Sequence, residues 1–438
     1  MLRQRGYSAY LVGGCVRDLL LGREPGDYDV ATSATPDEVM RIFPRTFAVG
    51  AQFGVVLVPL RRNEAGADGG RENYAVEVAT YRSDGLYSDG RHPDQVQFST
   101  DARLDVQRRD FTINGLLLDP MSQQVLDYVG GQADLKRGII RAIGAPGLRF
   151  AEDKLRMLRA VRFAARFGYQ IEPQTFAAIR ELAPQIHQVS HERIRDEILK
   201  MLTEGSARRA FELLDETGLL QQVLPEVKKM QGVEQPPQYH PEGDVWVHTL
   251  MLLEQLPAGV SKTLALGVLL HDVGKPPTFR VAPDRIRFDQ HAEVGTRMAA
   301  EICHRFHMSN DETHQVCALV ANHMRFADVA RMKESTLKRF FRLPRFEEHL
   351  ELHRLDCLSS HRDLSLYELA REKVHALPAE QIRPAPLITG HDLIAAGYKP
   401  GPSFKELLMA VEDAQLEGAI SSKEEALELV KSRMEQDN

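Results

Sequence analysis

Two aspartates stand one residue apart in the segment Gly26–Val30, which reads GDYDV. On an extended strand, residues i and i+2 point to the same side, so Asp27 and Asp29 are expected to converge on one spot. Two carboxylates suit Mg²⁺, and a third lets two ions bind a triphosphate and activate an attacking hydroxyl. Glu77, in VEVATYR, is the natural third. The pattern predicts a magnesium-dependent catalytic site.

A glycine pair precedes these carboxylates, in the run LVGGCVRDLLLG that spans residues 11–22. A strand that enters a turn at Gly13 and Gly14 lets backbone N–H groups close on a phosphate, and Arg17 adds positive charge. Taken separately, Asp-Tyr-Asp is a common turn and Gly-Gly a common bend. Both features in this order indicate a nucleotide-transfer site.

The elements that must position these residues change along the chain. Strand-like segments, SAYLVGG, GVVLVPL and AVEVATY, mix with helical patterns such as TPDEVMRIF in the N-terminal third. After about residue 153 apolar residues recur at helical spacing, and a hairpin near 280–288 is the other strand signal expected. Segments rich in Pro and Gly predict boundaries near 224–244 and 377–390. The expected domains are an α+β head at 1–145, a helical neck at 146–222, and two further helical parts at 238–365 and 366–438.

Composition narrows the class of protein. With 438 residues, 43% of them hydrophobic and 27% charged, the chain should form several globular domains. Four cysteines without a CxxC pair, and no apolar run long enough for a membrane span, favour a cytoplasmic protein without a membrane partner. The net charge of −7 argues weakly against nucleic acid, but residues 137–166 carry eight basic and two acidic side chains. A basic face is therefore expected there.

Within this basic segment, Asp153 and Arg156 are three residues apart. The sequence predicts that Glu152–Arg156 opens a helix, on which the two side chains share a face. A carboxylate acceptor beside a guanidinium donor suits the amine and adjacent acceptor that adenine and cytosine both present. An ordinary ion pair on a solvated helix is the alternative.

A second group of residues suggests metal chemistry in the helical part. An adjacent His-Asp, followed by Gly274 and Lys275, ends the apolar run at 264–270, and other histidines flank it. Imidazoles and carboxylates suit a hydrolytic divalent-metal site. The predicted ligands are His248, His271, Asp272, His291, His323 and Asp356. A helical platform for RNA without metal is the alternative.

Five ordered motifs resemble one family. Besides the glycine and aspartate motifs taken together, they are RRDFTIN at 108–114, DYVGGQADL at 127–135, RFAEDKLRMLRAVRFAARFGY at 149–169 and ERIRDEILKML at 192–202. They resemble the class II tRNA nucleotidyltransferases and bacterial poly(A) polymerases, whose head is similar to DNA polymerase beta. The histidine group looks like an HD domain, a metal-dependent phosphohydrolase fold. The resemblance implies a nucleotidyltransferase head, a helical RNA-binding neck, an HD domain and a helical tail.

The resemblance also implies roles for individual residues. Asp27 and Asp29 match the metal ligands of the head, and Mg²⁺ is the implied cofactor there, with a divalent metal of unknown identity at the HD site. The nucleotide-binding positions match Gly13, Gly14 and Arg17 for the triphosphate, Arg109 and Asp110 for ribose and phosphates, Asp153 and Arg156 for the base, and Arg159 and Arg162 near the phosphates. The segment 80–98 is similar to a loop that helps CCA-adding enzymes change from cytidine to adenosine.

The implied reaction is addition of CCA, or of its terminal A, to the 3′ end of tRNA from CTP and ATP, with release of pyrophosphate. A poly(A) polymerase acting on other RNAs, or an HD phosphohydrolase with a nucleotide-binding head, are the alternatives. The segment 49–58, VGAQFGVVLV, lacks the basic Gly-Arg-Arg-Phe stretch of poly(A) polymerases and favours the tRNA enzyme. The expected partners are tRNA, ATP and CTP, without an obligatory protein partner.

Overall fold

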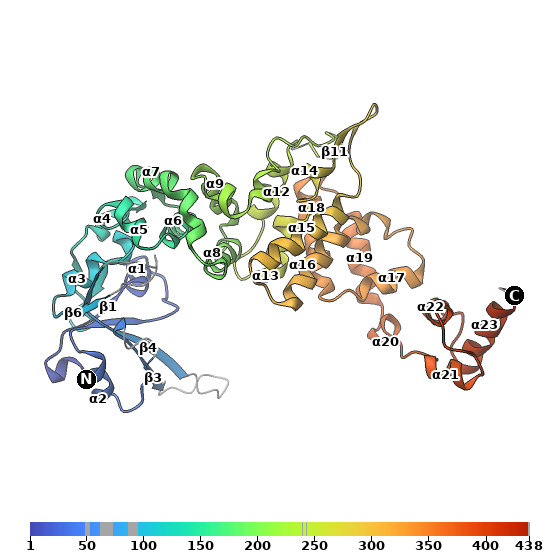
Figure 1. Ribbon diagram of the computed structural model, residues 1–438, viewed down its shortest axis with the longest axis horizontal. Coiled ribbons are helices and arrows are strands. Elements are labelled where there is room, and N and C mark those ends of the chain that lie inside the picture. Colours follow the sequence, from blue (N-terminus) through green and yellow to red (C-terminus); the bar gives the residue numbers. More distant parts are fainter. Residues whose placement is uncertain (49–52, 62–72, 86–94, 239, 242, 437–438) are drawn as a thin grey trace. The chain divides into compact units, whose positions relative to one another are not determined.

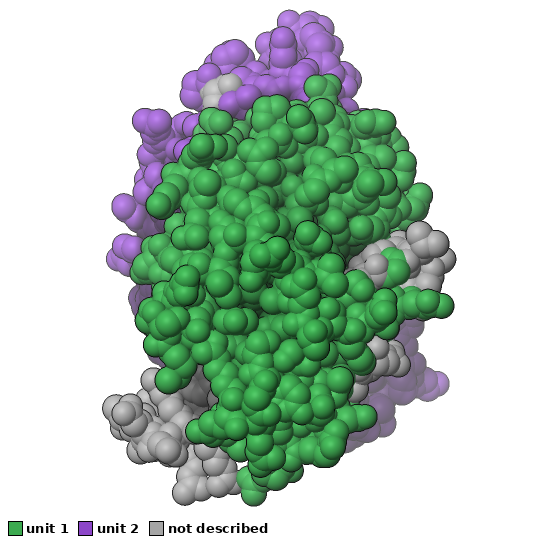
Figure 2. All heavy atoms as spheres, turned by 90° about the vertical axis from the view of Figure 1, so that its left-hand side faces the viewer, with its two compact units in different colours: residues 1–228, 257–259 green, residues 229–256, 260–438 purple. Residues whose placement is uncertain are grey.

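The computed structural model describes residues 1–48, 53–61, 73–85, 95–238, 240–241 and 243–436. The chain forms two compact units (Figure 2). Unit 1 comprises Met1–Lys228 with Pro257–Gly259, and unit 2 comprises Lys229–Leu256 with Val260–Asn438. The change of unit after Lys228 falls inside the Pro- and Gly-rich segment 224–244. The finer division into head, neck and tail stays a prediction.

Unit 1 is built on a mixed six-stranded sheet with the order β3-β4-β2-β1-β7-β8. Its strands are β1 Ala9–Val12, β2 Asp29–Thr32, β3 Val55–Arg61, β4 Asn73–Thr80, β7 Leu116–Leu118 and β8 Val125–Asp127. Strands β2 and β4 are parallel, and their register pairs Asp29 with Glu77. Directly paired residues lie on the same face of a sheet, so this register brings the third predicted carboxylate beside the second.

Apolar residues at alternate positions explain why these strands form. Val56 and Val58 of β3 and Val78 of β4 are buried in one cluster with Val39 of α2 (Pro36–Ile42). This helix begins with a capping box between Thr35 and Glu38 and a proline in its first turn. A second cluster buries Val12, Ala31, Tyr81, Val106 and Leu117. Two hydrophobic clusters therefore hold the sheet and its helices.

The remaining elements of unit 1 are mostly helical (Figure 1). They are η1 Arg3–Arg5, α1 Gly14–Leu20, β5 Arg82–Asp84, β6 Val96–Phe98, α3 Ala102–Gln107, η3 Thr112–Asn114, α4 Gly131–Arg137, β9 Ile139–Ile140, α5 Pro146–Glu152, α6 Leu155–Phe167, β10 Gln170–Ile171, α7 Pro173–Leu182, η4 Ala183–Gln188, α8 His191–Thr203, α9 Ala207–Glu216, α10 Leu219–Val223 and α11 Pro225–Lys228. Helix α6 packs on α8 and α9, and this contact positions the residues discussed below.

The expectation that Glu152–Arg156 opens one helix is wrong. Glu152 is the last residue of α5, and Asp153 is extended, with φ −147° and ψ 107°. Helix α6 begins at Leu155, and its backbone N–H donates to Asp153 Oδ1 at 3.0 Å. An aspartate side chain that bonds a nearby backbone N–H competes with the helical conformation, so Asp153 separates the two helices.

Unit 2 is helical apart from one hairpin. Its elements are α12 Val245–Glu254, α13 Lys262–Leu270, α14 Lys275–Thr278, β11 Phe279–Val281, β12 Ile286–Phe288, α15 His291–Arg305, α16 Asn310–Asn322, η5 His323–Asp328, α17 Glu334–Phe341, α18 Phe346–Ser359, α19 Ser365–Ala376, α20 Ala379–Ile382, α21 Gly390–Ala395, α22 Ser403–Leu416 and α23 Lys423–Gln436. Strands β11 and β12 pair antiparallel, as predicted for 280–288. Helix α13 is buried along nearly its whole length, which explains its uninterrupted apolar sequence.

The last helices have a hydrophobic cluster of their own. Leu393 of α21, Leu407 and Val411 of α22, and Val430 of α23 are buried together. Arg339 of α17 forms an ion pair with α22 at 2.7 Å through Glu412. No helix among the described residues is long and apolar enough to cross a membrane.

Candidate functional site

A cavity of about 420 Å³ in unit 1 collects most of the predicted nucleotide-binding residues. It is lined by Gly13, Gly14, Arg17, Asp29, Arg108, Arg109, Asp110, Asn114, Arg156, Arg159, Arg162, Phe163 and Arg166. These residues come from the turn between β1 and α1, from α1 itself, from β2, from the segment before β7 and from α6. An excess of guanidinium groups over carboxylates suits an anionic ligand such as a triphosphate.

The backbone conformation of the turn before α1 favours glycine at position 13. Gly13 has φ +78°, which is unfavourable for a residue with a side chain. A Cβ atom added there would lie 3.3 Å from Arg109 Nη1, tighter than an ordinary contact. The turn therefore combines a backbone that favours glycine with a close approach to one of the cavity's arginines.

Arg17, on α1, is buried at the wall of the cavity, with 4% of its surface exposed. Its Nη1 donates to Asn114 Oδ1 at 2.7 Å, and its Nη2 lies 2.8 Å from Asp18 Oδ1. Burial lowers the pKa of Arg17, the charge of Arg166 adds to this, and Asp18 opposes it. Positive charge is thus crowded here, as expected of a site for phosphate groups.

The predicted carboxylates differ in their placement. Asp29 is half-buried at the start of β2 beside Glu77, whereas Asp27 is exposed in the bend before the strand. Burial raises the pKa of Asp29, the charges of Glu77 and Asp27 add to this, and Arg109 opposes it. A donor set of carboxylates that disfavour one another's charge fits a divalent cation, which would relieve the repulsion.

Asp105 and, within the RRDFTIN motif, Asp110 hold arginines of the cavity wall in place. Asp105, in α3, accepts from Arg108 at 2.6 Å and from Arg109 at 3.0 Å. Asp110 accepts from Asn114 at 3.0 Å and pairs with Arg159 at 2.8 Å. Burial opposes the charge of Asp110, but Arg159 and Asn114 outweigh it and hold the pKa below its ordinary value. Both carboxylates are therefore held ionised, as anchors for guanidinium groups.

The predicted base-reading residues bond other partners and not each other. Asp153 accepts from Arg193 of α8 at 2.7 and 3.2 Å. Arg156 donates to Glu152 at 2.6 Å and to the backbone oxygen of Arg149 at 3.0 Å. Of the two, Arg156 lines the cavity. The ordinary ion pair between positions 153 and 156, considered above as an alternative, is not what the structure contains.

Arg159 and Arg162 project from α6 into the cavity wall. Arg162 donates to Glu197 of α8 at 2.7 Å, and both side chains are buried. Sequence reasoning missed Glu197 and Arg193, although both lie in the quoted motif ERIRDEILKML, because the pairing depends on how α6 packs on α8. It also missed Phe163, which the sequence offered only as one of the apolar residues that recur at helical spacing after residue 153.

The loop at 80–98 is described only at its ends, where β5 and β6 pair antiparallel. Of the loop's polar residues that could reach a ligand, Asp84 ends β5, whereas Asp89, Arg91 and His92 lie outside the described residues.

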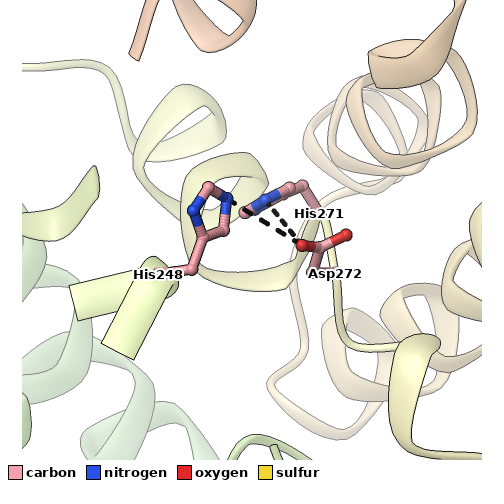
Figure 3. Close-up of side chains that lie close together, drawn as sticks. All are labelled: His248, His271 and Asp272. Atoms are coloured by element: carbon pink, nitrogen blue, oxygen red, sulfur yellow. Dashed lines mark ion pairs between the residues drawn. The ribbon is translucent and has the colours of Figure 1, made fainter. Parts of the chain in front are cut away.

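In unit 2, four of the predicted histidine ligands lie around the buried carboxylate of Asp272, and Figure 3 shows two of them, His248 and His271. Its Oδ2 lies 3.2 Å from His271 Nε2 and 4.0 Å from His248 Nε2. Its Oδ1 lies 3.7 Å from the Nε2 atoms of His291 and His323. Side chains from α12, α15, η5 and the end of α13 thus lie around one carboxylate, and their role as metal ligands stays a prediction.

Backbone carbonyls fix the orientation of three of these rings. Nδ1 of His271 lies 2.8 Å from Val268 O, Nδ1 of His323 lies 2.7 Å from Val320 O, and His291 makes the same contact with Phe288 at 2.9 Å. A ring whose Nδ1–H donates to a carbonyl presents the lone pair of Nε2. The arrangement therefore fits metal coordination through Nε2 beside a carboxylate.

Neighbouring cations keep Asp272 ionised, whereas burial disfavours the charged form of His323. Lys275 Nζ lies 2.7 Å from Asp272 Oδ2, and Asp356 pairs with His248 at 3.1 Å. Despite burial, the cations around Asp272, Lys275 foremost, hold its pKa well below the ordinary value. Burial lowers the pKa of His323 to about 4. A cavity of about 480 Å³, lined in part by His291, His323 and Asp356, adjoins the cluster.

The fold and cavity of unit 1 define the class of protein as a nucleotidyltransferase. A sequence family described as "Poly A polymerase head domain" matches residues 9–141. Two more match residues 168–231, "Probable RNA and SrmB- binding site of polymerase A", and residues 290–430, "tRNA nucleotidyltransferase domain 2 putative". By these three matches the chain is similar to the tRNA nucleotidyltransferases and poly(A) polymerases along much of its length.

Individual relatives agree with this family. The chain is 45% identical over 218 residues to the CCA-adding enzyme of Geobacillus stearothermophilus, which covers 50% of this chain and 51% of that enzyme. It is 38% identical over 257 residues to the CCA-adding enzyme of Lactobacillus johnsonii, covering 58% and 62%. The chain therefore spans about half, or somewhat more, of the curated relatives it matches.

Solved structures extend the likeness along the chain. The structure of the Bacillus stearothermophilus CCA-adding enzyme in complex with CTP matches with a TM-score of 0.70 and 28% identity, and covers 100% of this chain and 96% of that one. The Thermotoga maritima CCA-adding enzyme complexed with tRNA matches with a TM-score of 0.57 at 20% identity, covering 99% and 93%, which shows the fold. The predicted α+β head with a mostly helical remainder is confirmed.

Proposed function

We propose that this protein is a tRNA nucleotidyltransferase that adds CCA, or its terminal A, to the 3′ end of tRNA from CTP and ATP. The observation that carries the proposal is the cavity of unit 1, which brings the glycine turn, Asp29 and the arginines of α6 together. The CCA-adding enzymes among the relatives, one of them solved with CTP, support the choice of substrates.

In the proposed reaction the 3′-hydroxyl of tRNA attacks the α-phosphorus of the nucleotide, and pyrophosphate leaves. Asp27, Asp29 and Glu77 would hold Mg²⁺, which would neutralise phosphate charge and favour ionisation of the attacking hydroxyl. Arg17 and Arg159 would bind the triphosphate, and each is already oriented by an acceptor, Asn114 or Asp110. Positioning and charge neutralisation supply most of the acceleration in such a site.

Choice of base is assigned in this proposal to Asp153 and Arg156. A carboxylate has about four lone-pair sites, so Asp153 can accept from a base amine while it keeps Arg193. Arg156 would donate to the neighbouring ring acceptor from its place in the cavity wall. In this proposal Arg193 orients Asp153, and Glu152 orients Arg156, so the two base-reading side chains stay separate.

The test is addition of labelled nucleotides to three RNAs. These are a tRNA that ends before CCA, a tRNA that ends in CC, and an unstructured oligomer, each with CTP, ATP and both. Addition of C and then A to the first tRNA is expected of a complete CCA-adding enzyme. Addition of A only to the CC-ended tRNA would assign terminal A addition. Long A tails on the oligomer would indicate a poly(A) polymerase instead.

A second candidate activity, metal-dependent phosphohydrolysis by an HD-type domain, rests on the Asp272 cluster. The convergence of Nε2 atoms on one buried carboxylate beside a cavity favours it over a helical RNA platform without metal. Metal content after reconstitution with Mg²⁺, Mn²⁺, Ni²⁺ or Co²⁺, and hydrolysis of a 2′,3′-cyclic phosphate, would test it. If unit 2 binds no divalent metal, a helical platform for RNA without metal is favoured instead.

The proposed substrates also imply where the protein acts and what it binds. A tRNA-processing enzyme would act in the cytoplasm, which agrees with the scattered, unpaired cysteines. The proposal requires tRNA, ATP and CTP as partners.

A further inference from the structure

Phe163 lies in the wall of the cavity among arginines that are expected to bind phosphate. Its ring is on α6 with 5% of the residue exposed, and it lines the cavity of unit 1. The guanidinium carbons of Arg162, Arg159 and Arg17 lie over this ring, at 4.4, 5.2 and 5.3 Å from its centroid. One aromatic side chain therefore contacts three of the cavity's cations.

A second ring continues this arrangement. Phe167, one helical turn further, is nearly parallel to Phe163, with centroids 6.1 Å apart and an interplanar angle of 15°. Arg17 also lies over Phe167 at 4.6 Å, as do Arg23 at 5.3 Å and Arg166 at 5.5 Å. Positions i and i+4 share a helix face, so the two rings form one aromatic surface beneath the arginines.

The three arginines around Phe163 also have polar partners. Arg162 is bonded to Glu197 at 2.7 Å, Arg159 pairs with Asp110 at 2.8 Å, and Arg17 with Asn114 at 2.7 Å. The negative face of an aromatic ring attracts a guanidinium and does not compete for its N–H donors. The ring can therefore fix the orientation of a cation that must still exchange hydrogen bonds with a phosphate.

We infer that Phe163 is a positioning residue for nucleotide binding, which holds Arg17, Arg159 and Arg162 in the geometry that receives a triphosphate. The inference rests on the nucleotidyltransferase function proposed above. It assigns no chemical step to Phe163, because the ring touches the arginines and not the reacting atoms. Leucine in its place would keep an apolar side chain of similar reach but remove the ring face from all three cations.

The experiment compares Phe163→Leu with Phe163→Tyr and with a control, Phe211→Leu. Phe211 is fully buried in α9 of the same unit and does not line the cavity. Dissociation constants for CTP and ATP are measured by calorimetry without RNA, and KM and kcat by nucleotide addition. Phe163→Leu should raise the dissociation constant and KM about tenfold, with kcat changed less than about twofold. Phe163→Tyr, which keeps the ring, should restore both values.

Two results would overturn the inference. One is a Phe163→Leu protein with wild-type nucleotide affinity and KM. The other is that Phe163→Leu and Phe211→Leu lower activity in proportion to the same loss of thermal stability, with KM unchanged. Failure of the proposed function is separate, because there the wild-type protein itself would add no nucleotide to any of the three RNAs.

Discussion

The two candidate sites handle negative charge in opposite ways. In unit 1, burial and the neighbouring carboxylates raise the pKa of Asp29, and Arg109 only partly offsets them. In unit 2, Asp272 is more deeply buried, yet its pKa lies well below the ordinary value because Lys275 and the imidazoles outweigh burial. The carboxylates of unit 1 therefore gain most from an added cation, whereas Asp272 already has a cation of the protein beside it.

The nitrogen-bearing side chains of the two sites also differ. Arginines line the first cavity, and each one described above already bonds a carboxylate or amide of the protein. A triphosphate entering it would add bonds to guanidiniums that are already oriented. In the second site the rings present Nε2 to one carboxylate, with Nδ1 bonded to backbone oxygens. The first arrangement suits reversible binding of a charged substrate, and the second suits a resident metal.

The largest effect expected from this contrast is that of Asp29→Asn. The change removes a charge from the carboxylate pair of β2 and β4, so nucleotide addition should fall roughly 10³-fold or more. RNA affinity should stay close to that of the wild type. Single-turnover addition with saturating Mg²⁺, together with filter binding of tRNA, measures both. Asp37→Asn, on the exposed face of α2, is the matched control, and retained transfer by Asp29→Asn would reject the metal role.

Loss of metal from unit 2 is the next effect in size. The double substitution His271→Ala with Asp272→Asn removes two of the converging groups, so bound divalent metal and any hydrolase activity should disappear. Nucleotide addition should persist, because the cavity of unit 1 is untouched. Asparagine keeps an acceptor for Lys275, which limits the cost of leaving a buried ammonium without a partner.

Metal content by mass spectrometry and the two activity assays check this prediction. His304→Ala is a suitable control, because His304 is exposed on α15. A parallel loss of addition and hydrolysis would mean that the two sites do not act separately.

Base choice should change more modestly. Asp153→Ala removes the acceptor proposed for the amine of adenine and cytosine, so discrimination against UTP and GTP should weaken about tenfold. The comparison is between kcat/KM values for the four nucleotides. Asp196→Ala, which removes an exposed carboxylate of α8, should leave the ratios unchanged. Unaltered ratios in the Asp153→Ala protein would assign that residue to holding Arg193 only.

Both candidate sites could be proposed from the sequence because each depends on short motifs. The glycine turn, the aspartates before and in β2 and the adjacent His271-Asp272 are local patterns with a direct chemical meaning. The strand identity of 73–80 was also readable, although the register that places Glu77 beside Asp29 was not. Register depends on how two distant strands align, which alternation of apolar residues restricts but does not determine.

The partners of the charged residues were the part that sequence reasoning missed. Asp153 was expected on a helix with Arg156, but nothing in a segment without Gly or Pro indicated that the helix would be interrupted there. Arg193 and Glu197 come from α8, and their pairing with α6 is a consequence of packing. In the sequence Phe163 is only one apolar residue at helical spacing, whereas in the structure it is buried with three arginines over its ring.

The last prediction concerns acid sensitivity, which should differ between the units. His349 of α18 is buried, and burial together with Arg325 lowers its pKa from 6.5 to about 4. As the pH falls, this ring is protonated in the unfolded chain before it is protonated in the folded one. The contribution of His349 to the free energy of unfolding is therefore fully present above about pH 6.5 and is lost as the pH falls toward 4. The loss for this one group is on the order of 3 kcal/mol. In unit 1, Asp105 and Asp110 have lowered pKa values, so the stability they contribute is lost only at more acidic pH.

Urea unfolding at pH 7 and pH 4.5 measures the acid sensitivity of unit 2. Trp246, the chain's one tryptophan, is buried in α12 of unit 2, so its fluorescence reports on that unit alone. His349→Phe extends the aromatic cluster that includes Phe346 and removes the titrating ring, so it should reduce the loss of free energy between the two pH values. An equal acid sensitivity in the wild-type and His349→Phe proteins would show that other groups control the unfolding of unit 2.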